Sequence, residues 1–405
     1  MASSTTNPSN AGMLDRRARM NKTAAYYSAF IALGLATAYL GPTLPGLAKH
    51  VHSTIQQISS LFVASSLGYM LGSIMGGRLY DRVPGHPLLV SVVLLSALVM
   101  FVIPIVPLLW VLAVVLFIQG MASGMLDVGI NTLLVWVHRD EMGPFMNGLH
   151  FFFGIGTFVS PIIIAQAVLL SGDIYWAYWA LGLIMLPAII LLIRLPSPKP
   201  IVTTGSAPLQ PALPLLIALL SLFDFCYVGS EVSFGGWIFT YATRLHFAPD
   251  SVAAYLTSGF WGAFTVGRLI SIPLAAKFPA RRILLVDLLL AMVGLLIIQL
   301  IPGSYVALWA GTLVVGLGMA SIFPTVIALA ESFMTITSWV TSWLFVGSSL
   351  GAMAMPWIIG QLFDSVGPFV TMISISTGLV LDLVLWVFMT AYEKRLEKSR
   401  VTSLG

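Results

Sequence analysis

Residues 87–107 read PLLVSVVLLSALVMFVIPIVP, an unbroken run without a charged side chain. A helix of about 20 apolar residues crosses the hydrocarbon core of a bilayer, which is about 30 Å thick. A strand of a membrane barrel would show about ten residues of alternating polarity instead. This stretch therefore predicts a membrane-spanning helix.

The whole chain of 405 residues shares this character, because 58% of its residues are hydrophobic and only 8% are charged. A soluble globular domain carries about 25% charged residues. The deficit excludes soluble enzymes, nucleic-acid-binding proteins and disordered scaffolds. The single cysteine, Cys226, excludes an intrachain disulfide framework and a cysteine-based metal cage. We expect no metal site and no cofactor.

Apolar runs between charged or turn-rich breaks predict twelve spans. The first half of the chain holds the runs 24–46, 55–79, 87–107, 109–137, 144–170 and 174–194. The second half holds the runs 213–241, 251–276, 282–301, 305–332, 337–362 and 367–391. We therefore predict an all-α integral membrane protein, with twelve transmembrane helices in two pseudo-symmetric six-helix bundles.

The stretch between the two sets of runs is rich in proline, which is typical of a linker. The predicted organisation is an N-terminal tail, a first bundle, a linker, a second bundle and a C-terminal tail, over residues 1–22, 23–194, 195–212, 213–392 and 393–405. Sixteen of the 19 lysines and arginines fall on one side of these spans, with both tails and the linker. Positive charge marks the cytoplasmic side, so both termini are predicted to be cytoplasmic. The net charge of +4 then reflects topology rather than an acidic partner.

Three short motifs recur in the same order in both halves, at nearly one offset. Gly-Arg-Leu occurs at 77–79 and 267–269, Gly-Met-Ala-Ser at 120–123 and 318–321, and a Gly and Pro pair at Gly156 with Pro161 and Gly351 with Pro356. Two parallel six-helix repeats are the architecture of a transporter that rocks around a site near the bilayer midplane. Glycines four residues apart, such as Gly68 and Gly72, predict close helix packing.

The loop at 76–86, GGRLYDRVPGH, resembles the signature loop of the major facilitator superfamily. The resemblance implies that Arg78, Asp81 and Arg82 make charge contacts that hold a cytoplasmic gate. The basic residues that usually end this loop are reduced to His86, so the match is partial.

Six further motifs are similar to the fucose:proton symporter family, and most of all to its branch with animal sodium-dependent glucose transporters. They are the segments 41–44, 126–131, 149–151, 229–232, 267–269 and 321–325. The similarity implies that the first, fourth, seventh and tenth spans line a central cavity. Fucose symporters also carry an acidic residue in the first span. This chain has none there, so their two-carboxylate scheme cannot be transferred whole.

A charged residue inside a span is costly, so each predicts a function or a partner. Asp127 and Asn131 are four residues apart and share one face of a helix. Asp127 is expected to be a protonatable or ion-binding carboxyl group, and Asn131 a hydrogen-bond partner of a sugar. The alternative is that the two residues form a structural polar contact with a neighbouring helix. A second stripe holds Asp224, Tyr227 and Glu231. We expect coupling or ion binding at Asp127, Glu231 and Asp224, and substrate binding at Asn131, Asn147, His150, Tyr227 and Trp237. Arg268 is expected to be a structural charge, and Asp382 receives no role.

These residues favour an ion-coupled sugar symporter, driven by protons or by sodium. An exporter of drugs or metabolites on the same fold, working as a proton antiporter, is the alternative. Such exporters commonly carry a Gly-Pro pair in the fifth span, which is not present in residues 144–170. The expected partners are a small-molecule substrate, the coupling ion and the lipid bilayer, with no nucleic acid, for a protein that acts as a monomer.

Overall fold

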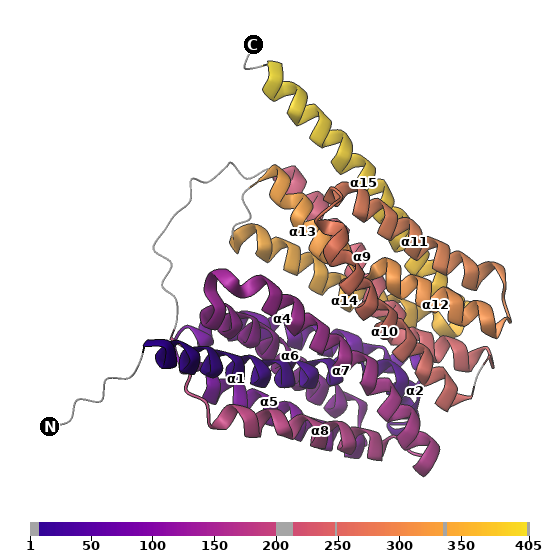
Figure 1. Ribbon diagram of the computed structural model, residues 1–405. Helices are drawn as coiled ribbons and strands as arrows, with labels where there is room; N and C mark the ends of the chain where they lie inside the picture. Colours follow the sequence, from indigo (N-terminus) through magenta and orange to yellow (C-terminus); the bar gives the residue numbers. More distant parts are fainter. Residues whose placement is uncertain (1–7, 200–213, 248, 335–337, 403–405) are drawn as a thin grey trace.

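The computed structural model describes residues 8–199, 214–247, 249–334 and 338–402, and within these residues every regular element is a helix (Figure 1). The first half contains α1 (Pro8–Leu35), α2 (Leu40–His50), α3 (Ile55–Ile58), α4 (Ser60–Tyr80), α5 (Gly85–Val102), α6 (Leu109–His138), α7 (Met142–Ser171) and α8 (Tyr175–Ile193). The second half contains α9 (Pro214–Arg244), α10 (Asp250–Ala275), α11 (Ala280–Leu300), α12 (Tyr305–Met319), α13 (Ile322–Phe333), α14 (Ser338–Val366) and α15 (Val370–Thr402).

Each of the twelve predicted spans coincides with one helix or with two consecutive helices. In the described part of the chain, ten helices are long and apolar enough to cross a membrane, and the bent pair α1 and α2 adds an eleventh span. The remaining span is α10, a helix of 26 residues whose apolar character is reduced by Arg268 and several hydroxyl residues. The chain is thus a multi-pass membrane protein.

Two predicted spans are interrupted. The first span bends by 46° between α1 and α2, and the tenth is divided into α12 and α13. The terminal helices also run further than expected, because α1 already begins at Pro8 and α15 continues to Thr402. Most of the predicted linker, 200–212, lies outside the described residues.

The helices form two bundles that pair their members in the same way (Figure 1). In the first bundle α4 packs on α6, α1 on α7, and α5 on α8. In the second bundle the corresponding pairs are α10 on α12, α9 on α14, and α11 on α15. This correspondence confirms the predicted pseudo-symmetry.

Glycines bring the helices of a pair into backbone contact, as predicted from their spacing. A Cβ atom added to Gly68 of α4 would overlap the carbonyl oxygen of Phe117 on α6, and one added to Gly120 would overlap that of Ser65. In the second bundle, Gly347 lies equally close to the backbone of α9. Small residues allow this close approach where lipid supplies no hydrophobic driving force between helices.

The two bundles contact each other through α7 with α10 and through α4 with α14, and polar side chains join them at one end of the molecule. We call the end where α1 begins and α15 ends the tail end, and the opposite end the far end. At the far end, Gln361 Nε2 donates to the Gln56 carbonyl oxygen (3.1 Å) and to Ser59 Oγ (3.2 Å), and Gln56 Nε2 donates to Gln361 Oε1 (3.0 Å). We refer to these three residues as the far-end contact. It joins α3 of the first bundle to α14 of the second.

Candidate functional site

A central cavity of about 370 Å³ lies between the two bundles. Its wall is built by α1, α4, α6 and α7 from the first bundle, and by α9, α10, α13 and α14 from the second. Four predicted site residues line it, namely Asp127, His150, Glu231 and Arg268. The structure therefore brings together carboxyl groups that are about a hundred residues apart in the chain and belong to different bundles.

Asp127 is held by hydrogen bonds within the first bundle. The hydroxyl group of Tyr69 on α4 donates to Asp127 Oδ2, and Asn131 Nδ2 donates to Oδ1 at 2.9 Å. The same amide group also donates to the Asp127 backbone oxygen at 2.9 Å. Asn131 thus orients the carboxyl group, and it is not among the residues of the cavity wall.

Glu231 has a close partner one helical turn away. The hydroxyl oxygen of Tyr227 lies 2.5 Å from Glu231 Oε2 and 2.8 Å from the Met319 carbonyl oxygen. Tyr227 is fully buried and, like Asn131, stands behind the residue that reaches the cavity. The predicted stripe thus holds the carboxyl group in a defined position.

Arg268 is the basic group of the cavity wall. Its Nε donates to the Ala320 carbonyl oxygen (3.3 Å), and its guanidinium lies 4.6 Å from the centre of the Phe264 ring. It interacts electrostatically with both Asp127 and Glu231. Within the described residues it forms no direct ion pair with either carboxyl group. The structure places it in the cavity wall.

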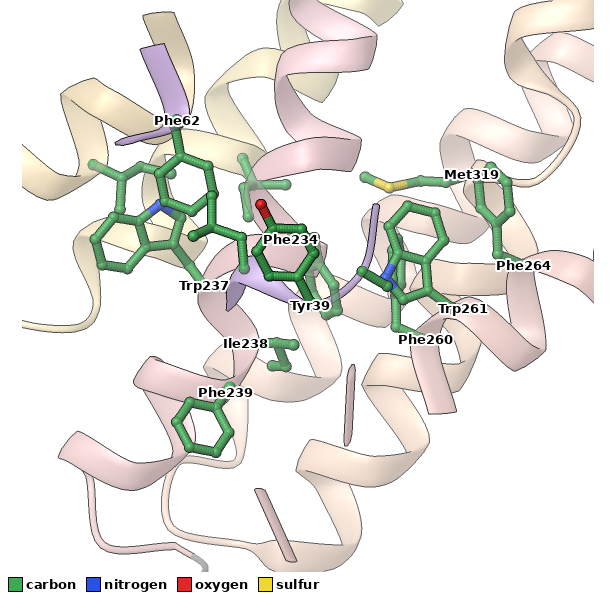
Figure 2. Packing of buried hydrophobic residues seen from close by; sticks show 14 of the residues in the cluster. Tyr39, Phe62, Phe234, Trp237, Ile238, Phe239, Phe260, Trp261, Phe264 and Met319 are labelled. Atoms are coloured by element: carbon green, nitrogen blue, oxygen red, sulfur yellow. The ribbon is translucent and has the colours of Figure 1, made fainter. Parts of the chain in front are cut away.

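The tryptophan in the cavity wall is not the expected Trp237. Trp261 of α10 lines the cavity, and its indole N–H has no hydrogen-bond partner among the described residues. Trp237 is fully buried outside the cavity, where its N–H donates to the Pro356 carbonyl oxygen at 3.1 Å. Figure 2 shows Trp237 beside Phe62, and Trp261 beside Phe260 in another part of the cluster. Trp261, and not Trp237, is therefore the tryptophan that contributes to the cavity wall.

The two predicted residues of α7 separate in the structure. His150 lines the cavity and contacts the edge of the Phe30 ring, with centroids 5.7 Å apart. Asn147 is exposed and does not reach the cavity wall. One turn of helix is enough to place them in different surroundings.

Asp224 lies two helical turns from Glu231 and outside the cavity. It is fully buried, as is Asp382 of α15, and the two carboxyl groups interact electrostatically. Neither has a hydrogen-bond partner among the described residues. In this conformation Asp224 therefore cannot bind the same ion as Asp127 and Glu231, although ion binding was expected of it.

The charges in the last turn of α4 and in the loop that follows it are exposed. Arg78, Asp81 and Arg82 make no side-chain hydrogen bond or ion pair within the described part of the chain. His86 anchors this loop instead. Its Nδ1 donates to the Leu195 carbonyl oxygen (2.8 Å), which leaves Nε2 to accept from the buried Tyr26 hydroxyl (2.7 Å).

Several polar residues of the cavity wall were not predicted from the sequence, among them Tyr69, Ser123 and Trp261. Ser123 Oγ has no hydrogen-bond partner among the described residues. Ser123 lies in the repeated motif Gly-Met-Ala-Ser, which was the available signal. Nothing in the sequence separates Tyr69 and Trp261 from the other aromatic residues of the spans.

Comparisons with known proteins agree with this architecture. A family model described as the Major Facilitator Superfamily matches residues 26–352. Sodium-dependent glucose transporter 1 of Xenopus laevis is 32% identical over 404 residues, which covers 91% of this chain and 82% of that protein. The Homo sapiens protein of that name is 30% identical over 374 residues, which covers 83% and 72% of the two chains. The crystal structure of nucleoside transporter NupG has the same fold, with a TM-score of 0.72 at 12% identity, over 92% of this chain and 99% of that one.

Proposed function

The chain belongs to the Major Facilitator Superfamily, and from this premise we propose that it is a symporter that carries a sugar together with a cation across the cell membrane. The observation that carries the proposal is the central cavity with Asp127 and Glu231 on opposite bundles and Arg268 within electrostatic reach of both. Two acids and one base leave an excess of negative charge when both acids are ionised. A bound cation neutralises this excess, which favours binding of cation and solute together.

The cavity also suits a polyhydroxylated solute. Recognition of a sugar requires hydrogen-bond donors and acceptors and an apolar face for the ring. Ser123, Tyr69 and the two carboxyl groups supply the polar contacts, and Trp261 supplies the face. The relatives named sodium-dependent glucose transporters favour a hexose as the solute and sodium as the ion, with the proton as the other candidate.

We place the tail end in the cytoplasm, because the basic residues gather there. The far-end contact then closes the cavity on the outside, and we assign this conformation to the stage at which the solute leaves toward the cytoplasm. Rocking of the two bundles about the cavity exposes it to the other side. We propose that a monomer performs this cycle.

The test is uptake of a panel of labelled hexoses into proteoliposomes, under sodium and proton gradients imposed separately. We expect one gradient to drive accumulation. Asp127→Asn and Glu231→Gln should each abolish uphill accumulation while downhill exchange survives, because only coupling needs the charge. Asp364→Asn, which removes an exposed carboxyl at the far end, is the matched control.

Normal accumulation by both cavity variants would contradict coupling at these carboxyls. Extrusion of dyes without uptake of any hexose would contradict sugar symport and favour an exporter.

A further inference from the structure

The tenth span is interrupted beside the cavity. Helix α12 ends at Met319, and α13 begins at Ile322. Proline has no N–H, so Pro324 cannot donate to the carbonyl oxygen of Ala320, four residues before it. Carbonyl groups at the end of a helix need donors from outside the helix.

Side chains from the neighbouring helices supply these donors and fix the break. Tyr227 of α9 contacts the Met319 carbonyl oxygen at 2.8 Å, and Nε of Arg268 on α10 donates to the Ala320 carbonyl oxygen at 3.3 Å. On the other side, Ser321 Oγ donates to Asp287 Oδ2 on α11 at 2.5 Å. Groups outside both helices thus bind the polar atoms of the break.

The hydroxyl group of Tyr227 also serves Glu231, whose Oε2 lies 2.5 Å from it. This hydroxyl has one hydrogen and faces two acceptors when Glu231 is ionised, so only one of the two contacts is a hydrogen bond at a time. When Glu231 is protonated, its hydroxyl donates to the Tyr227 oxygen, and Tyr227 donates to Met319. Only the protonated carboxyl group satisfies both contacts.

We propose that Tyr227 and Arg268 are positioning residues that transmit the protonation of Glu231 to the break between α12 and α13. While Glu231 is neutral, both donors stay on the carbonyl groups of the break. When its proton leaves for the cavity, the hydrogen of Tyr227 turns to the carboxylate, and the guanidinium of Arg268 is drawn to the same charge. The carbonyl groups lose their donors, and α13 changes its angle to α12. The inference rests on the proposed function in its proton-coupled form, in which Glu231 carries the coupling proton.

Several charged and titratable groups surround Glu231. They are Tyr227 on α9, Arg268 on α10, Asp127 on α6, His150 on α7, Tyr69 on α4 and, beyond Tyr227, Asp287 on α11. Asp382 on α15 interacts instead with Asp224 and Cys226. Any of these groups could make the break between α12 and α13 sensitive to pH. A pH-dependent change at the break is therefore assigned to Glu231 only when Glu231→Gln abolishes the change.

The experiment is hydrogen–deuterium exchange of the purified full-length protein, without sugar, followed in peptides that cover residues 317–325. Peptides of α8 are used to correct for the pH dependence of intrinsic exchange. In the wild type, the corrected exchange rate of peptides 317–325 should be about fivefold higher at high pH than at low pH. This factor corresponds to the loss of one hydrogen bond. Glu231→Gln should stay slow at every pH, because the amide still donates to Tyr227.

Tyr227→Phe should exchange fast at every pH, and Glu231→Gln should not slow it, because the link is absent. Tyr178→Phe is the matched control, since it removes a buried hydroxyl that lies 2.7 Å from Thr43 Oγ1 in the first bundle. Equal exchange in wild type and Glu231→Gln at all pH values would overturn the inference, and that comparison holds even where Tyr227→Phe does not fold. Because no sugar is present, a failed sugar-uptake assay with a pH-dependent break would overturn the sugar assignment alone.

Discussion

Replacing Gln361 by alanine should release the far end of the molecule. The substitution removes three hydrogen bonds between the bundles, two donated by Gln361 and one accepted from Gln56. Both side chains are at least partly exposed, so we take about 0.5 kcal/mol for each bond, the lower end of the usual range. The sum is about 1.5 kcal/mol, which corresponds to about a tenfold shift toward the conformation with an open far end.

The shift is measurable by electron paramagnetic resonance distances between two spin labels. Lys49 in the first bundle and Asp364 in the second are exposed and line one crevice at the far end, so labels there lie close together when this end is closed. Cys226 is the only cysteine, and its replacement by alanine gives the background for labelling. Gln361→Ala should raise the ratio of the long-distance to the short-distance population about tenfold.

Gln299→Ala is the matched control for this measurement. Gln299 Nε2 donates to Ser376 Oγ (2.9 Å) and to the Leu295 carbonyl oxygen (3.3 Å), so its hydrogen bonds stay within the second bundle. An unchanged distance distribution in Gln361→Ala, or an equal shift in Gln299→Ala, would refute the role of the far-end contact in the conformational equilibrium.

Three further outcomes follow from the packing. Trp261→Ala should raise KM for the transported hexose about tenfold, the equivalent of about 1.4 kcal/mol, whereas Trp237→Ala should lower folded yield in size-exclusion chromatography because its ring is fully buried outside the cavity. Gly120→Ala should destabilise the protein by about 1–3 kcal/mol in thermal unfolding, because the added methyl meets backbone; Gly143→Ala, with open space around it, should have no effect, and equal melting temperatures would contradict this. Asn147→Ala should transport the hexose with unchanged KM, since Asn147 is exposed. A raised KM would indicate that Asn147 does bind the substrate.

The spans were predictable because crossing a membrane demands a minimum length of apolar chain. Every span therefore shows a long run of apolar residues, including α10 despite Arg268. The breaks between α1 and α2 and between α12 and α13 were harder to predict, since the segments on both sides of each break are equally apolar. Pro42, the third residue of α2, and Pro324, the third residue of α13, were usable signals for the two breaks.

The site was predictable in part. The cost of burying a charge pointed to Asp127 and Glu231, and both line the cavity. Helical spacing alone did not separate Asp224 from Glu231, because Asp224 lies on the same stripe but about 10 Å away along the axis and outside the cavity. The choice between Trp237 and Trp261 depends on which helix face meets the other bundle, and pattern within one helix does not contain that information.

The length of α15 has a practical consequence. Its 33 residues extend about 50 Å, whereas the hydrocarbon core is about 30 Å thick. A soluble domain joined after Thr402 by an uninterrupted helix would stand clear of a detergent micelle and turn as one body with the second bundle. It would supply the asymmetric mass that electron cryomicroscopy needs to align a 43.6 kDa membrane protein. Its tilt against the micelle would then report directly on the rocking of the two bundles.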